Sequence, residues 1–202
     1  MREIPLAAAQ LLVVLVGIPG SGKSTFARRV IEDTAAVPTQ ACWRRISQDE
    51  LRKRRRCIVE ADKALAAGDH VIIDRCNFDA TQRAPWMDLR GAPSAHRIAV
   101  FFDASRPEAV DRVLYRTAVS EEVDPIKEYK MRGVISKMGN ELRPPRLAEG
   151  FHEVLWCRHG DEEGCAPGLV VSHVTRTVMT GGDSSPSSGF ARHAVVRCSR
   201  GV

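Results

Sequence analysis

LLVVLVGIPGSGKS, residues 11–24, is the stretch that decides the fold of this chain. Its first six residues are apolar, and such a run is typical of a strand buried on both faces in a parallel sheet. The next eight residues match G-x-x-x-x-G-K-[ST] at every fixed position. Residues 24–32 then have a helical pattern. A strand, a glycine-rich turn and a helix in this order predict a P-loop.

The residues of this turn have predicted roles in binding ATP. Glycines let the backbone wrap around phosphate groups with its N–H groups pointing inward, and a helix start favours negative charge. We expect Lys23 to neutralise the β- and γ-phosphates and the Ser24 hydroxyl to bind Mg²⁺. The predicted nucleotide-binding residues are Gly17, Ile18, Pro19, Gly20, Ser21, Gly22, Lys23, Ser24 and Thr25.

Short apolar strands alternate with helices along most of the remaining chain. Strands are predicted at 41–47, 70–74, 97–103 and 151–156, and helices at 51–67, 81–89, 107–119 and 121–140. This alternation predicts an α/β fold with a doubly wound parallel sheet, here a P-loop NTPase fold. The last helix is charged with few apolar residues, so we expect it to form a lid over the site.

Composition limits the classes of protein to consider. The 202 residues are 44% hydrophobic and 27% charged with a formal net charge of +5, values typical of a soluble globular protein that tolerates a polyanionic partner. We predict a kinase domain at 1–157 and a poorly ordered tail at 158–202. No run is long enough to span a membrane. The absence of CxxC pairs favours an intracellular location, and the apolar N-terminal run is interpreted as a strand rather than a secretion signal.

Two acidic residues end predicted strands. Asp74 closes the strand at 70–74, and Asp103 closes the strand at 97–103. Sites on parallel sheets form at the carboxyl ends of strands, so either carboxylate could hold Mg²⁺ together with Ser24. Asp74 is the preferred metal ligand. Asp103 is alternatively a helix cap or a loop acid, and coordination through water alone is a third alternative.

Three further strings resemble the polynucleotide 5′-hydroxyl kinase family. They are ISQDELR at 46–52, IIDRCNFDATQR at 72–83, and FD at 102–103 with Arg112 and Arg116 after it. The strings QD at 48–49, IDRCN at 73–77 and LAEGF at 147–151 are most similar to the kinase-like N-terminal domain of plant and fungal aprataxin-like proteins. The resemblance covers residues 11–156 and does not include the histidine-triad hydrolase domain of those proteins.

The resemblance implies a kinase that transfers the γ-phosphate of ATP to a 5′-hydroxyl end of DNA or RNA, in nucleic-acid repair or processing. It implies that Asp49 is the general base, that Arg52 contacts the acceptor phosphate and that Arg116 contacts ATP and stabilises charge in catalysis. Asn77 and Arg83 fall within its second string and are expected either to orient the acceptor or to stiffen the loop.

The chemistry of these residues leaves alternatives open. Phosphoryl transfer to an alcohol needs positioning, charge neutralisation and a base. Asp49 lies between a predicted strand and a predicted helix, where it is either that base or a helix N-cap. Arg112 and Arg116 share a helix face that meets either ATP or solvent.

The chain also has a basic run with seven Lys and Arg residues between Arg44 and Arg56. This run is either a patch for a phosphate backbone or a solvated helix face. Trp43 and Trp86 either stack on bases or belong to the core. Two other functions remain open, a P-loop kinase of a small-molecule hydroxyl and a non-catalytic ATP-binding module of a repair protein.

Overall fold

The computed structural model describes residues 10–35, 42–91, 93–120 and 125–158. The predicted tail lies outside these residues apart from residue 158, so the boundary at residue 157 stays a prediction. No helix in the described ranges is long and apolar enough to cross a membrane. The intracellular location stays a prediction.

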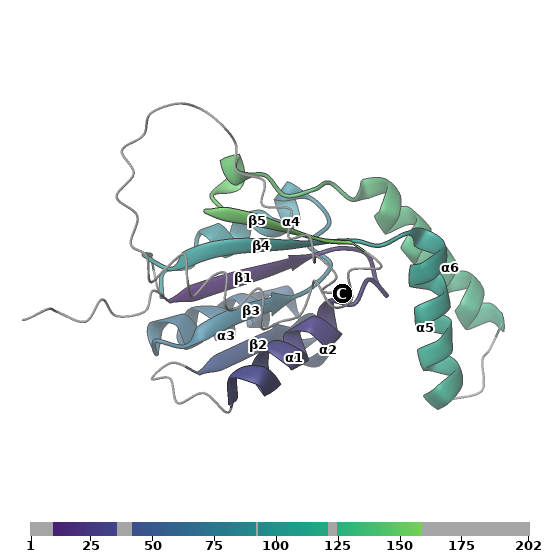
Figure 1. Ribbon diagram of the computed structural model, residues 1–202, viewed down its shortest axis with the longest axis horizontal. Helices are drawn as coiled ribbons and strands as arrows, with labels where there is room; N and C mark the ends of the chain where they lie inside the picture. The colour runs from purple at the N-terminus through teal and green to yellow at the C-terminus, as the bar shows by residue number, and fades with distance from the viewer. Residues whose placement is uncertain (1–9, 36–41, 92, 121–124, 159–202) are drawn as a thin grey trace, which may run out of the picture.

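A five-stranded parallel sheet is the centre of the fold (Figure 1). Its strand order is β2-β3-β1-β4-β5, and all neighbouring strands run parallel. This arrangement confirms the predicted doubly wound α/β fold. The strands are β1 (Leu11–Val16), β2 (Trp43–Ser47), β3 (His70–Asp74), β4 (His96–Asp103) and β5 (Glu153–Arg158).

Helices cover both faces of the sheet (Figure 1). Leu11, Val13 and Leu15 of β1 belong to the core under α1 (Lys23–Ala35). The alternate residues of β1 belong to the core under α3 (Arg54–Ala66) and α4 (Ala80–Met87). Side chains alternate between the faces of a strand, so a strand covered on both sides needs an unbroken apolar run.

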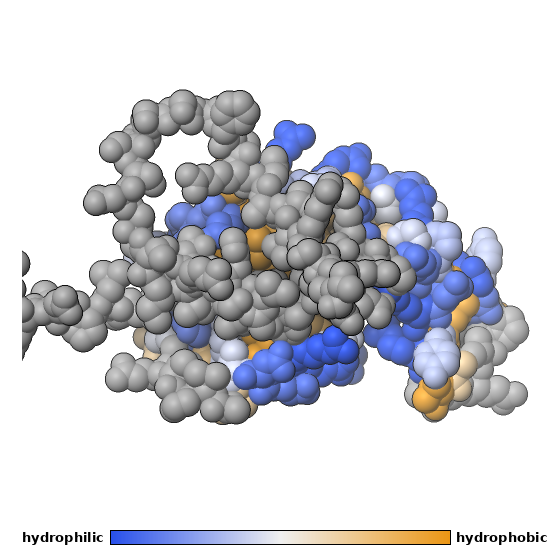
Figure 2. All heavy atoms as spheres, viewed as in Figure 1, coloured by the Kyte–Doolittle hydropathy of each residue, from blue (hydrophilic) through white to orange (hydrophobic). Residues whose placement is uncertain are grey.

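A pair of helices, α5 (Arg106–Ser120) and α6 (Pro125–Glu141), projects beyond the carboxyl ends of the strands (Figure 1). The pair packs onto the P-loop through a separate small core made of Ile18, Ala109, Val110, Val113 and Ile135. The face of the pair seen in Figure 2 is mainly hydrophilic, with a small hydrophobic patch at the end far from the sheet. The predicted helix at 121–140 therefore has more buried apolar contact than its charged composition suggested.

The predicted helix at 51–67 corresponds to α3, which starts three residues later, and residue 51 belongs to a separate short helix. A short helix, α2 (Gln48–Leu51), ends at Arg52, whose φ of 64° lies in the left-handed region, and α3 begins after Lys53. Leu51 and Ile58 pack against the same core, so the spacing of apolar residues looks like that of one continuous helix. The predicted start of this helix was wrong because the spacing of apolar residues does not reveal the turn at residues 52–53.

Candidate functional site

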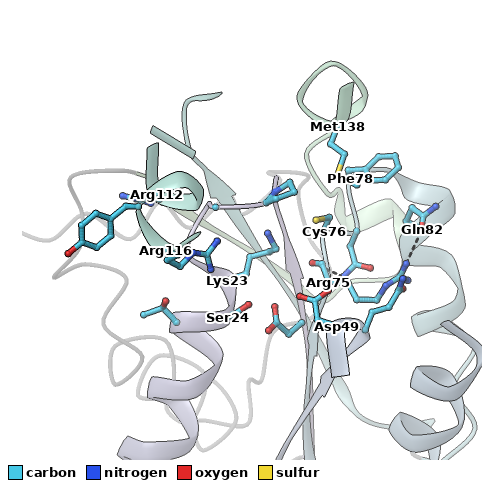
Figure 3. Close-up of a pocket in the computed structure, with 18 residues that line it drawn as sticks. Lys23, Ser24, Asp49, Arg75, Cys76, Phe78, Gln82, Arg112, Arg116 and Met138 are labelled. Carbon is cyan, nitrogen blue, oxygen red and sulfur yellow. Dashed lines mark hydrogen bonds between the residues drawn. The ribbon is translucent and has the colours of Figure 1, made fainter. Parts of the chain in front are cut away.

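A pocket of about 530 Å³ opens at the carboxyl edge of the sheet. It is lined by residues of the P-loop, of α2, of the segment after β3 and of α5 and α6 (Figure 3). The lining residues are Pro19, Gly20, Gly22, Lys23, Ser24, Thr25, Gln48, Asp49, Asp74, Arg75, Cys76, Asn77, Phe78, Gln82, Arg112, Tyr115, Arg116 and Met138.

The order and register of the strands bring these segments together. Ser47 at the end of β2 pairs with Asp74 at the end of β3, so the residues that follow both strands emerge at the same edge. The P-loop is fixed beside them because the backbone N–H of Gly17 donates to the carbonyl of Cys76 at 2.9 Å. Motifs more than 50 residues apart in the sequence thus meet in one pocket.

Lys23 is held over the P-loop. Its Nζ donates to the carbonyl oxygen of Ile18 at 2.7 Å and to Oγ of Ser21 at 3.2 Å. Burial lowers the pKa of Lys23 below its usual value, while nearby Cys76 and the carboxylates of Asp74 and Asp49 act in the opposite direction. The ammonium group therefore lies at the floor of the pocket with two fixed hydrogen-bond partners, where phosphate oxygens could contact it.

Gly20 packs against α5, so a substitution at Gly20 tests the contact between the P-loop and the helix pair. A Cβ at Gly20 would lie 2.2 Å from the carbonyl oxygen of Ala109, whereas a Cβ at Gly22 would meet nothing within 4 Å. Both glycines have positive φ, +82° and +99°, so an alanine strains the backbone at either position. We expect Gly20→Ala to lower the melting temperature more than Gly22→Ala does. Equal losses would show that the contact with α5 is unimportant.

Asp74 is the better placed of the two candidate metal ligands. Its carboxylate is almost fully buried, and its Oδ2 accepts from Nη2 and Nε of Arg45 at 2.6 and 2.8 Å. Asp103 is exposed at the end of β4 and is not among the pocket residues. Ser24 and Asp74 both line the pocket and supply hard oxygen ligands, which fits Mg²⁺ because that ion usually uses one or two protein oxygens together with phosphates and water.

Asp49 lies in the first turn of α2 and is exposed at the pocket. The N-cap of α2 is Ser47, with no side-chain capping bond. The alternative that Asp49 is an N-cap is therefore wrong. Figure 3 places its carboxylate across the pocket from Arg116, on the side of Arg75.

Arg112 and Arg116 both line the pocket from α5 (Figure 3). Arg116 lies close enough to Lys23 to contribute to lowering its pKa. Both arginines are therefore placed where they could contact a bound nucleotide, and their predicted contact with ATP stays a prediction. Tyr115, which stands between them in the sequence, also lines the pocket.

Two of the residues predicted to bind the acceptor, Arg52 and Asn77, differ in their position relative to the pocket. Arg52 is exposed at the end of α2 and is not among the lining residues. The amide of Asn77 is tied to the core, since its Nδ2 donates to the carbonyl of Leu15 at 2.8 Å and its Oδ1 accepts from Trp86 at 3.0 Å. Of the two roles predicted for Asn77, the structure supports stiffening of the loop.

Arg83 is a structural residue rather than an acceptor contact. It is buried, and its Nε and Nη2 donate to the carboxylate of Glu149 at 2.6 and 2.8 Å. Its Nη1 donates to the carbonyl oxygens of Asn77 at 2.9 Å and Arg143 at 3.0 Å. The guanidinium thus joins the loop after β3 to the segment after α6, and we correct its predicted substrate-binding role accordingly.

Removing Glu149 should destabilise the protein. Glu149→Ala leaves the buried guanidinium of Arg83 without its counter-ion, a change that typically lowers the free energy of unfolding by about 3 kcal/mol. Glu128→Ala is the matched control because the Glu128–Arg132 pair on α6 is partly exposed, with 33% of the Glu128 side chain and 52% of the Arg132 side chain accessible, and surface pairs contribute less than about 1 kcal/mol. Denaturant unfolding measures both. Equal losses would contradict the structural role of Arg83.

The basic run is partly neutralised within the protein. Arg44 pairs with Asp69 at 2.8 Å, Arg45 pairs with Asp74, and Arg54 donates to the carbonyl of Thr81 at 3.1 Å. The predicted patch is therefore reduced to the residues that stay exposed, which are Arg52, Lys53, Arg55 and Arg56 as well as Arg44.

The two tryptophans do not form a base-stacking platform in the pocket. Trp86 is fully buried, so the stacking alternative is wrong for it. Trp43 begins β2, at the end of the strand away from the pocket, and its ring lies 4.8 Å from that of His70.

Several pocket residues were not predicted from the sequence. Arg75 directly follows the candidate metal ligand Asp74, and this adjacency was an available signal. Gln48, Phe78 and Gln82 lie within the strings quoted above but had no predicted role, and Tyr115 and Met138 lie outside those strings, so only the structure places these side chains at the pocket.

Comparison with known proteins agrees with this architecture. Residues 12–57 match the family model AAA_33, described as an AAA domain. The chain is 32% identical over 155 residues to the Arabidopsis thaliana protein named transcription factor bHLH140, which covers 74% of this chain and 16% of that protein. It is 39% identical over 80 residues to a bifunctional polynucleotide phosphatase/kinase of Schizosaccharomyces pombe, covering 40% of this chain and 18% of that protein.

A solved gluconokinase from Sinorhizobium meliloti superposes with a TM-score of 0.58 at 15% identity, covering 85% of this chain and 94% of that one. The present chain spans less than a fifth of the curated relatives, 16% and 18% of their lengths. The P-loop motif, the sheet order and these similarities together identify the described part of the chain as an α/β domain with the P-loop kinase fold.

Proposed function

We propose that this chain is an ATP-dependent kinase that phosphorylates the 5′-hydroxyl end of a polynucleotide. The observation that carries the proposal is a single pocket lined on one side by Lys23 and Ser24 and on the other by the carboxylate of Asp49 (Figure 3). A phosphate donor and a hydroxyl acceptor could therefore meet between them. The 39% identity to a polynucleotide phosphatase/kinase favours a polynucleotide as the acceptor.

The residues on the P-loop side would hold ATP. Successive backbone N–H groups of the loop surround the phosphates, and Lys23 and Arg116 supply the positive charge for the transferred group. Ser24 and Asp74 would hold Mg²⁺, which neutralises phosphate charge when it is bound. Arg45 keeps the Asp74 carboxylate in place through its two bonds to Oδ2.

Asp49 would act on the acceptor. Its carboxylate takes the proton of the 5′-hydroxyl, whose oxygen bonds to the γ-phosphorus while the bond to the bridging β–γ oxygen breaks and ADP leaves. The exposure of Asp49 at the pocket suits this role because an incoming chain end must reach the carboxylate from solvent.

Incubation with γ-labelled ATP and a panel of acceptors tests the proposal. The panel contains 5′-hydroxyl DNA and RNA oligonucleotides, nucleosides and sugars. We expect label on the oligonucleotides. Label only on a nucleoside or sugar would identify a small-molecule kinase, and ATP binding without any labelled acceptor would favour a non-catalytic module.

The salt dependence of acceptor binding is a second test. A polynucleotide displaces counterions when it binds, so its affinity should fall steeply between about 50 and 200 mM salt. Fluorescence anisotropy of a labelled 5′-hydroxyl oligonucleotide measures this slope. A flat response would contradict a polynucleotide acceptor.

A further inference from the structure

We propose that Arg75, supported by Arg54, binds the phosphate group next to the acceptor hydroxyl and so makes the pocket select acceptors that carry such a phosphate. This inference rests on the proposed kinase function and specifies its substrate. Arg75 lines the pocket, yet none of the roles described above uses it.

Arg75 lies on the acceptor side of the pocket. It follows Asp74 directly in the chain and is drawn beside Gln82 in Figure 3, away from Arg112 and Arg116. Lys23 of the P-loop and the proposed base Asp49 line the same pocket as Arg75. Arg75 is therefore within the site where donor and acceptor would meet.

The described part of the chain does not fill the hydrogen-bonding capacity of Arg75. Its Nη1 is buried with no hydrogen-bond partner among the described residues, and its Nη2 makes a long bond of 3.3 Å to Oε1 of Gln82. The guanidinium lies 5.8 Å from the centroid of the Trp86 ring. Buried polar atoms are nearly always paired, so turning this guanidinium toward a bound oxyanion would replace few existing bonds.

The positive charge of Arg75 lies near a second positive charge, that of the Arg54 guanidinium. Neither arginine has a carboxylate partner in the ion pairs found within the described ranges. Nε of Arg54 is likewise buried without a hydrogen-bond partner there. Two partly buried cations close together favour an anion between or beside them.

A phosphate of the acceptor is the anion that fits. In a polynucleotide with a free 5′-hydroxyl, the nearest phosphate is attached to the 3′-oxygen of the same nucleotide. When the hydroxyl is at Asp49, this phosphate lies one sugar ring away, on the acceptor side where Arg75 is found. A guanidinium can bind phosphate oxygens through two parallel bonds. Arg52, by contrast, is exposed outside the lining, so Arg75 takes the contact expected of it.

Two acceptors that differ only in a phosphate group test this inference. Steady-state kinetics would compare a nucleoside 3′-phosphate with the same nucleoside lacking phosphate, in the wild type, Arg75→Gln, Arg75→Lys and Arg52→Gln. Arg29→Gln is the charge-matched control because Arg29 is exposed on α1 and outside the pocket. We expect Arg75→Gln to raise KM for the 3′-phosphate by about 10- to 100-fold, with KM for ATP and turnover of the plain nucleoside unchanged. Arg75→Lys should recover part of this loss.

Two results would overturn the inference. Equal losses on both acceptors would show that Arg75 only supports the fold, and a phosphate-specific loss in Arg52→Gln but not in Arg75→Gln would assign the contact to Arg52.

If the wild type labels no acceptor, the proposed kinase function fails, and anisotropy with a 5′-hydroxyl oligonucleotide then tests the anion site separately. Weaker binding and a shallower salt slope in Arg75→Gln, but not in Arg29→Gln, would support the site. Unchanged binding would reject it.

Discussion

Replacing Lys23 with alanine is expected to reduce phosphoryl transfer by about 10²–10³-fold. The ammonium group is held at the floor of the pocket by the carbonyl of Ile18 and the hydroxyl of Ser21. It is a buried positive charge placed where charge on the transferred phosphoryl group would develop, and such preorganised charges contribute most to catalysis. Turnover of a 5′-hydroxyl oligonucleotide with γ-labelled ATP measures the loss.

Lys63→Ala is the matched control for this experiment. Lys63 is exposed on α3 and pairs only weakly with Glu60 at 3.1 Å, so its loss should leave turnover and melting temperature unchanged. The Lys23 variant should remain folded, because its side chain contacts the loop rather than the apolar core. A folded Lys23→Ala protein with normal turnover would contradict the assignment of residues 17–24 as the phosphate site.

Asp49→Asn is expected to lower turnover by about 10²–10⁴-fold, the usual contribution of a general base. The amide has nearly the shape of the carboxylate but cannot take a proton from the acceptor hydroxyl. Ser47, and not Asp49, is the N-cap of α2, so no capping bond is lost. ATP affinity and melting temperature should therefore stay close to those of the wild type.

Stability, ATP binding and turnover must be measured on the same preparation of this variant. Asp33→Asn, at an exposed position of α1, controls for the loss of one negative charge. If Asp49→Asn keeps its turnover within a few-fold, Asp49 is not the base. Asp74 would then be tested next, although its contacts with Arg45 favour a metal-binding role.

The local features of the fold could be predicted from the sequence alone. The unbroken apolar run of β1, the eight-residue motif after it and the acids at the ends of β3 and β4 are all set by consecutive residues. The apolar run predicts a buried strand because a strand covered on both faces needs apolar residues on both. The motif predicts a P-loop because phosphate binding needs its glycines and lysine at fixed positions.

The tertiary structure decided which of these residues meet. Arg83 and Asn77 had two predicted roles each, and contacts with Glu149 and Leu15 more than 60 residues away give both side chains a structural role, while Asn77 also lines the pocket. Arg52, in a left-handed turn, lies outside the pocket lining, while Arg75 lines the pocket and has no carboxylate partner among the described residues. These contacts depend on long-range packing and on which buried polar groups find hydrogen-bond partners. Neither can be predicted from local sequence patterns.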